Sequence, residues 1–246
     1  MKNFFSHIKT YLFSAYAWTI CYVWMFFLFL VLIILFPVFP HRKTHEAFAA
    51  RAFALVLKML GIQTKIHYDE KFDPQCRSVF CQNHVNLLDG FIATASIPHV
   101  FCGLMHAWQF WIPIYGWLMK ISQGIAVHQK KKSGKLQDII EQAKKRKQMG
   151  YSILCFPEGH RTRDGHVHSF RKGMFFMARE SGYPIVPIAV KGNYEINQKG
   201  SRLFHPGNLE VFVGPQCSTE GLSDMQIETL AQRTQQWIRQ KVEGQL

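Results

Sequence analysis

The sequence predicts an α/β fold, a mostly parallel sheet flanked by helices, joined to an N-terminal membrane-embedded helical segment. From residue 62 onward, short strand-like runs alternate with helical patterns, and this order favours a parallel sheet. Residues 10–40 contain no charged residue and no histidine, and their centre is strongly apolar. The chain therefore divides into a membrane-anchoring helical region, residues 1–61, and an α/β domain, residues 62–246.

The balance of charge indicates the kind of partner. The chain of 246 residues has 29 Lys and Arg against 16 Asp and Glu, a formal net charge of +13. This excess favours anionic partners such as a phospholipid membrane, a phosphorylated substrate or an acidic carrier protein. We predict no nucleic-acid partner, because no zinc-finger spacing, RNP-like motif or helix-turn-helix signature supports one.

The amino-terminal segment is predicted to lie in a membrane. Its centre, residues 23–36, is almost wholly apolar, and about 20 such residues cross a hydrocarbon core of roughly 30 Å. Tyrosine and tryptophan crowd its amino half, as at membrane interfaces, and Pro37 and Pro40 end it. Basic residues flank both ends, so a spanning helix and a re-entrant segment both remain open.

Residues 44–60 alternate apolar and basic residues at helical spacing and end at Gly61. This pattern is typical of an amphipathic helix on the membrane surface. The alternative is a core helix of the α/β domain. We favour the surface helix, because Arg51 and Lys58 stand among apolar neighbours.

The α/β domain is predicted from short runs bounded by turn residues. Strands are expected at 64–68, 78–81, 100–104, 125–128, 151–156, 185–190 and 209–213. Helices are expected at 87–96, 114–122, 136–149, 173–181 and 224–242. The basic run 130–135 is expected to be a solvated loop, with contact to membrane phosphates as the alternative.

Polar residues follow the strand that ends near Cys81 and precede a helix, which places His84 at the carboxyl end of that strand. Ligands bind at this edge of open α/β sheets. Asn86 is a suitable N-cap, and Asp89 lies in the first helical turn, from which its carboxylate can reach His84. The pair is a candidate base and its orienting carboxylate. The alternative is that Asn86 and Asp89 only cap the helix, while His84 is an ordinary loop histidine.

A second polar stretch after a strand, Phe156-Pro-Glu-Gly-His-Arg161, favours the catalytic alternative. With the HxxxxD pattern from His84 to Asp89 and the later Val186-Pro-Ile-Ala-Val190, the chain resembles the glycerolipid acyltransferases, in particular the 1-acyl-glycerol-3-phosphate (lysophosphatidic acid) acyltransferases. The resemblance covers residues 78–190 and the membrane-embedded amino end.

The resemblance implies that His84 is the general base for a lysophospholipid hydroxyl and that Asp89 holds the imidazole in one tautomer. It implies an acyl-CoA or acyl-carrier protein donor as co-substrate, with no cofactor and no metal. One base suffices for this reaction. The alcohol must be deprotonated before it attacks, whereas a thiolate is a good leaving group and needs no further catalytic residue. The oxyanion donors are not identified by the sequence, and backbone amides of the 112–116 turn are one candidate.

The resemblance also implies the residues that bind the acceptor. Arg161 is expected to bind the phosphate, and Glu158 either positions Arg161, binds the glycerol hydroxyl or is a buried loop carboxylate satisfied by amides. Gly159, Arg163 and His106 complete the expected substrate site, and the alternative for Arg163 is a solvated surface charge. The family commonly has lysine where this chain has His106, so another lyso-lipid remains open as the acceptor.

Two functional alternatives remain. One is a membrane-anchored hydrolase of thioesters or lysolipids that uses the same base to activate water. The other is a membrane-binding protein without turnover. The 6 cysteines form no CxxC pair, which indicates a reducing compartment, and we expect the catalytic domain on the cytoplasmic face of the membrane.

Overall fold

The computed structural model describes residues 2–35, 48, 50–128 and 135–244. These residues form a 7-stranded sheet with the order β1-β7-β6-β2-β5-β3-β4. The strands are β1 (Ile62–Tyr68), β2 (Val79–Gln82), β3 (Phe101–His106), β4 (Ile125–Val127), β5 (Ser152–Cys155), β6 (Ile185–Lys191) and β7 (Gly207–Val213). All neighbouring strands are parallel except β6 and β7, which are antiparallel.

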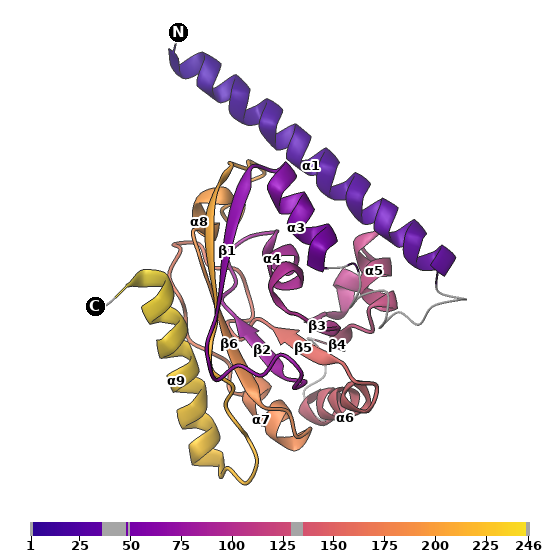
Figure 1. The fold of residues 1–246 in the computed structure, drawn as a ribbon, viewed down its shortest axis with the longest axis vertical. Helices are drawn as coiled ribbons and strands as arrows, with labels where there is room; N and C mark the ends of the chain where they lie inside the picture. The colour runs from indigo at the N-terminus through magenta and orange to yellow at the C-terminus, as the bar shows by residue number, and fades with distance from the viewer. Residues whose placement is uncertain (1, 36–47, 49, 129–134, 245–246) are drawn as a thin grey trace.

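Helices cover both faces of this sheet (Figure 1). They are α1 (Lys2–Leu35), α3 (Ala50–Met59), α4 (Asp89–Ser96), α5 (Tyr115–Ile121), α6 (Lys135–Gln148), α7 (Gly173–Glu180), α8 (Asn193–Ile196) and α9 (Asp224–Glu243), with the 3-10 helix η2 (Ala107–Trp111). The predicted fold class, a mostly parallel sheet flanked by helices, is confirmed. The predicted strands and helices of the α/β domain are present, with ends that differ by a few residues.

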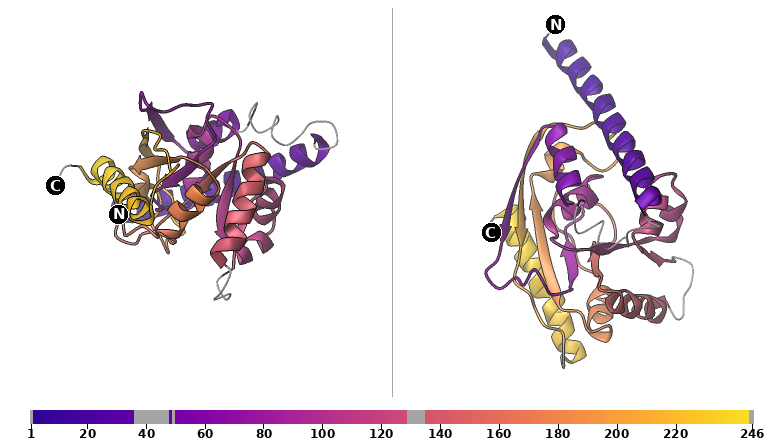
Figure 2. Two further views of the ribbon diagram at one scale, coloured as in Figure 1. Left: turned by 90° about the horizontal axis from the view of Figure 1, so that it is seen from below. Right: turned by 45° about the vertical axis from the view of Figure 1, so that its right-hand side comes forward.

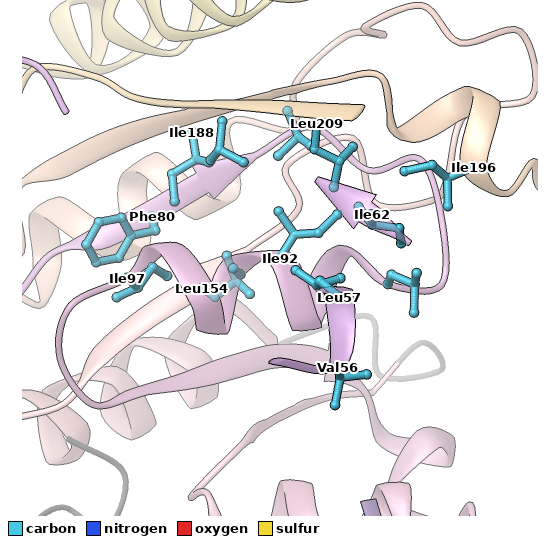
Figure 3. Close-up of a cluster of buried hydrophobic side chains, with 14 of the residues drawn as sticks. Val56, Leu57, Ile62, Phe80, Ile92, Ile97, Leu154, Ile188, Ile196 and Leu209 are labelled. Carbon is cyan, nitrogen blue, oxygen red and sulfur yellow. The ribbon is translucent and has the colours of Figure 1, made fainter. Parts of the chain in front are cut away.

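The central strands alternate their side chains between two cores. Phe80 of β2 packs with residues of α3 and α4 on one face. Its neighbours Val79 and Cys81 pack with residues of α6, α7 and α9 on the other face. Because side chains along a strand point to opposite faces, a strand covered on both sides is apolar throughout. This explains why the central runs are almost wholly apolar. Figure 3 shows the first core, where side chains of α3, α4 and the strands face one another.

The long amino-terminal helix α1 packs against the domain along one stripe. Ser14, Ala17, Cys21 and Met25 are buried and lie at helical spacing. The amino-terminal end of α1 projects beyond the domain in both Figure 1 and Figure 2. Residues His7–Leu35 are long and apolar enough to cross a membrane, by length and composition.

The segment predicted as a surface helix is partly a core element. Residues 44–47 and 49 of that segment lie outside the described residues. In α3, Val56 and Leu57 are buried in the core next to α4, as the core-helix alternative expects, while Arg51 and Lys58 are exposed. The contact of α3 with a bilayer stays a prediction. The division of the chain into two regions at residue 61 also stays a prediction, and residues of α1 and α3 pack in one core with residues of the sheet. The basic residues 130–134 also lie outside the described residues.

Candidate active site

The carboxyl ends of β2 and its two parallel neighbours, β5 and β6, form one edge of the sheet. Cys81 pairs in register with Cys155 of β5 and with Pro187 of β6. The loops that leave these strands therefore begin side by side. The imidazole of His84, after β2, stacks on the ring of Phe156, after β5, with ring centroids 4.0 Å apart and an interplanar angle of 17°. The structure thus places His84 at the strand end, where the sequence predicts it.

His84 and Asp89 form a hydrogen-bonded pair. The Nδ1 atom of His84 lies 2.8 Å from Oδ2 of Asp89, and the two side chains are 24% and 1% exposed. Because an ionised carboxylate only accepts hydrogen bonds, Nδ1–H donates, and Nε2 keeps its lone pair. This is the tautomer that a general base at Nε2 requires.

Backbone and side-chain donors hold the Asp89 carboxylate in place. Oδ2 also accepts from the backbone N–H of Val85 (2.6 Å) and of Asn86 (3.1 Å), and Oδ1 accepts from Nδ2 of Asn193 (3.1 Å). Hydrogen bonds from several donors restrict the rotation of the carboxylate. Asp89 therefore satisfies the turn before its helix and orients His84 at the same time. The catalytic role of the pair stays a prediction.

The prediction that Asn86 caps the helix is wrong. Helix α4 begins at Asp89, and its N-cap residue is Leu88. Asn86 lies in the preceding turn, where Oδ1 accepts from the backbone N–H of Leu88 (2.8 Å) and Nδ2 donates to the carbonyl of Asn193 (2.8 Å). The asparagine side chain bonds its own backbone two residues on, as asparagine commonly does in turns, so the helix starts later.

Glu158 joins the two loops. Its buried carboxylate accepts from the backbone N–H of His84 at Oε1 (2.9 Å) and from that of His168 at Oε2 (3.1 Å). Burial raises the pKa of Glu158, while the two N–H groups and the nearby histidines act in the opposite direction. A loop carboxylate satisfied by amides was one of the alternatives for this residue. A direct role of Glu158 in binding substrate stays a prediction.

Arg161 has a buried donor that no described residue pairs with. Within the described part of the chain, Nη1 of Arg161 makes no hydrogen bond although it is shielded from solvent. Burial lowers the pKa of Arg161, and the nearby negative charge of Asp89 acts in the opposite direction. An unpaired buried donor is costly, so this nitrogen is suited to an anionic ligand. The arginine lies near His84, because the backbone N–H of the next residue, Thr162, donates to the His84 carbonyl (2.8 Å).

Gly159 is required by the turn. Its φ is +78°, and a Cβ there would lie 2.6 Å from Cζ of Arg171. Its N–H donates to the carbonyl of Phe156 (2.9 Å), so it is already engaged. Gly159 therefore shapes the loop that carries Glu158 and Arg161, and its predicted contact with substrate stays a prediction.

The remaining predicted residues lie further along the same edge. His106 ends β3, and its backbone N–H donates to Oε1 of Gln109 (3.0 Å). Arg163 is exposed in the loop after Arg161, and its carbonyl accepts from the hydroxyl of Tyr194 (2.8 Å). The structure brings His84, Asp89, Glu158 and Arg161 together and leaves the Arg163 side chain in solvent.

In the 112–116 turn, three of the backbone amides are already engaged, and the role of this turn as oxyanion donor stays a prediction. The N–H groups of Ile112, Tyr115 and Gly116 donate to carbonyls within and beside the turn, at 3.2, 2.7 and 2.7 Å.

Among the described residues, no group of three or more His, Cys, Asp and Glu side chains could hold a metal ion. Two histidines of the loop after Arg161 each lie beside one carboxylate. Nδ1 of His166 is 3.6 Å from Oε1 of Glu243, and Nε2 of His168 is 3.0 Å from Oδ1 of Asp164.

Sequence reasoning missed Asn193 as part of the site. This residue follows β6 and, through its side chain and its carbonyl, contacts both Asp89 and Asn86. Its only signal was its position as a polar residue after a buried strand. Asn83 connects the loop after β2 to strand β6, since its side chain accepts from Val190 N–H (2.8 Å) and donates to the Val190 carbonyl (3.0 Å).

The hydrogen-bonded pair His84–Asp89 at the sheet edge, with a buried Arg161 donor that has no partner among the described residues, defines the candidate site. The family model described as acyltransferase matches residues 63–191, which include His84, Asp89 and Arg161. The chain belongs to the acyltransferase family, and the predicted resemblance is confirmed.

Individual relatives are similar at a lower level. The 1-acyl-sn-glycerol-3-phosphate acyltransferase of Limnanthes douglasii is 28% identical over 166 residues, which cover 68% of this chain and 58% of that protein. The chain thus matches somewhat more than half of the plant protein's length. The protein of the same name from Pseudomonas aeruginosa is 25% identical over 236 residues, covering 94% of this chain and 89% of that protein.

A solved structure has the same fold. The crystal structure of the 1-acyl-sn-glycerophosphate (LPA) acyltransferase of Thermotoga maritima superimposes with a TM-score of 0.79 at 24% identity, over 96% of both chains. The agreement extends over nearly the full length, including the amino-terminal helical region.

Proposed function

We propose that the protein is a membrane-bound O-acyltransferase. It transfers a fatty acyl group from an acyl thioester, either acyl-CoA or acyl-carrier protein, to the free hydroxyl of lysophosphatidic acid. The product is phosphatidic acid, and the reaction belongs to phospholipid biosynthesis. The observation that carries the proposal is the buried Asp89 carboxylate 2.8 Å from Nδ1 of His84, which leaves Nε2 as the base. The names of the plant and bacterial relatives support the choice of acceptor.

The reaction proceeds in one transfer. His84 Nε2 takes the proton of the acceptor hydroxyl as the oxygen attacks the thioester carbon. The tetrahedral intermediate then breaks its C–S bond, and the imidazolium returns the proton to the leaving sulfur. Asp89 stabilises the positive charge that the imidazole carries between these two proton transfers.

The buried cysteines support direct transfer without an acyl-enzyme intermediate. Burial raises the pKa of Cys102 to about 12. The pKa of Cys81 is also raised, first by its hydrogen bond with Cys155 and then by burial. A thiol held protonated and out of solvent is a poor nucleophile. The only activated nucleophile that the mechanism needs is the acceptor hydroxyl.

Arg161 is the proposed phosphate ligand. The planar guanidinium can meet two phosphate oxygens at once, and its Nη1 has an open hydrogen-bonding position among the described residues. The Nζ of Lys199 donates to the Arg161 carbonyl (2.8 Å) and brings a second cation beside the loop. The helix α1 is the proposed membrane anchor, with the catalytic domain on the cytoplasmic face.

The test is an assay of the full chain purified in detergent, with radiolabelled acyl-CoA or acyl-carrier protein. The acceptors are lysophosphatidic acid, lysophosphatidylcholine and lysophosphatidylethanolamine, with a reaction that lacks any acceptor. We expect product from lysophosphatidic acid that is lost in His84→Ala. Preference for another lyso-lipid would correct the acceptor. Release of free fatty acid without transfer would identify a hydrolase, and liposome binding without turnover would identify a binding protein.

A further inference from the structure

Three tryptophans stand on the surface of η2 and α5. Trp108, Trp111 and Trp117 are 59%, 81% and 42% exposed. Soluble surfaces seldom expose large aromatic side chains in a group, and such groups mark interaction sites. Tryptophan is enriched where a protein meets the boundary between lipid and water, because its ring is apolar and its N–H is polar. The composition of this surface points to a bilayer interface.

A lysine stands beside this aromatic group. The Nζ of Lys120 lies 4.9 Å from the centroid of the Trp111 ring. A lysine next to an interfacial tryptophan places its ammonium at the level of lipid phosphates while its methylenes remain on apolar surface. The net charge of +13 has the sign that an anionic membrane attracts.

The aromatic surface is continuous with α1. The rings of Trp117 and Phe29 have centroids 5.2 Å apart. Figure 1 shows α5 beneath the carboxyl-terminal part of α1. In that part of α1, Phe26, Leu30 and Ile33 are exposed. The tryptophans therefore extend the apolar face of the candidate membrane helix onto the catalytic domain.

The base of this surface is rigidly packed. Phe110 of η2 and Leu118 of α5 are buried, and a side chain at Gly116 would meet the carbonyl of Phe110. Close contact between η2 and α5 fixes the backbone that carries the exposed rings. Little backbone freedom is therefore lost when the surface binds.

This surface lies at the same sheet edge as the catalytic pair. Helix η2 begins directly after β3, which is parallel to β5, and β5 is parallel to β2. The carboxyl end of β3 therefore points the same way as that of β2, from which the His84 loop leaves. A bilayer that contacts η2 and α5 would lie at the edge where the acceptor reacts.

We propose that Trp108, Trp111, Trp117 and Lys120 form a second membrane contact, here called the aromatic patch, which binds the lipid–water interface and seats the catalytic edge on the bilayer. The contact with lipid rests on the exposed rings and on their continuity with α1. Only the orientation of the reaction towards the bilayer rests on the proposed function.

The direct test measures the depth of Trp111 without using turnover. The full chain and its Trp111→Phe variant are reconstituted in vesicles of phosphatidylcholine and phosphatidylglycerol that contain phosphatidylcholine brominated near the headgroup end of its acyl chains. The difference between the two emission spectra reports Trp111. We expect bromolipid to quench this emission, and vesicles to protect it from aqueous iodide. Trp237→Phe is the matched control, because Trp237 lies on α9 and packs against the buried cluster that includes Val167 and Ile238. The emission of Trp237 should be insensitive to bromolipid.

Trp111 emission that iodide quenches equally with and without vesicles would overturn the proposal. Protection from iodide before vesicles are added, together with the mass of a dimer, would also overturn it and identify a contact between copies of the chain. Neither result depends on acyl transfer, so failure of this inference is distinguishable from failure of the proposed function.

A kinetic test uses the double variant Trp108→Ala and Trp111→Ala. We expect the KM for lysophosphatidic acid presented in vesicles to rise about tenfold, the equivalent of 1.4 kcal/mol of lost binding. The KM for a short-chain acceptor dissolved as monomers should be unchanged. An equal rise for both acceptors would contradict a role in lipid contact. If the double variant does not fold by circular dichroism, Trp111→Glu alone makes the same test at the more exposed position.

Discussion

The backbone N–H of His84 donates to Oε1 of Glu158 over 2.9 Å, although 74 positions separate the two residues in the chain. A second hydrogen bond, from Thr162 N–H to the His84 carbonyl (2.8 Å), closes the same connection from the other side. The residue proposed as the base is therefore held by the loop that carries the proposed phosphate ligand. One interlocked pair of loops thus sets the positions of both residues, the proposed base and the proposed phosphate ligand.

Replacing Glu158 by glutamine should weaken this connection. Glutamine can accept at its oxygen, but its NH2 group would face one of the two N–H donors, from His84 or His168, that Glu158 now satisfies. We expect a loss of about 1–3 kcal/mol in the free energy of unfolding and a lower kcat. Urea denaturation and steady-state kinetics measure the two effects. Unchanged stability and kcat would show that the connection does not position His84.

The raised pKa of Glu158 predicts a pH dependence of stability. Burial places the folded-state pKa above the ordinary value of 4.5. Between these two values the folded state binds more protons than the unfolded state, so this residue's contribution to stability falls as pH rises through that window. The difference in unfolding free energy between wild type and Glu158→Gln should therefore change with pH there and level off above it. A difference that is constant from pH 4 to 7 would contradict the raised pKa.

Asp89→Asn should lower kcat by about 10²–10⁴-fold, because the amide cannot fix the Nδ1–H tautomer or stabilise the imidazolium. Asp138→Asn is the matched control, since Asp138 is an exposed carboxylate in the first turn of α6. It should leave kcat unchanged. Wild-type rates in Asp89→Asn would show that Asp89 only satisfies the turn before α4.

Arg161→Lys keeps the charge and removes the planar fork. We expect the acceptor KM to rise about 10- to 100-fold with little change in the donor KM, because hydrogen bonds to charged groups are worth about 1.5–3 kcal/mol. Arg233→Lys, at an exposed position on α9, is the control and should change neither constant. Equal effects of Arg161→Lys on donor and acceptor would show that this side chain does not bind the acceptor phosphate.

Two glycines with the same φ angle allow the cost of backbone strain to be separated from the cost of a steric clash. Gly192 and Gly200 both have φ of +90°, but a Cβ at Gly192 would meet the carbonyl of Asn208, whereas a Cβ at Gly200 has open space. Gly200→Ala should cost about 1–2 kcal/mol of stability from the backbone angle alone. Gly192→Ala should cost more and should also lower kcat, because it displaces Asn193, which donates to Asp89. Equal thermal stability of the two variants would contradict this account.

Local patterns were sufficient for the strands and the longer helices of the α/β domain, whereas the short η2 and α8 were not predicted. Helical spacing and short apolar runs reflect which side chains face the core, and neighbouring residues determine that property. The start of α4 was misplaced because the side chain of Asn86 bonds the backbone of Leu88 and a carbonyl on the distant Asn193. A local capping rule does not include a partner so far along the chain.

By itself the sequence determined the α/β class, the apolar amino-terminal helix, the strand-end position of His84 and the pairing of His84 with Asp89, because each depends on residues close together in the chain. The strand order, the antiparallel pairing of β6 with β7, and the roles of Glu158 and Asn193 were decided only by the tertiary structure. These features arise where loops from β2, β5 and β6 meet. Their partners are brought together by the burial of the sheet between its two helical layers, which is a property of the whole chain and leaves no local pattern.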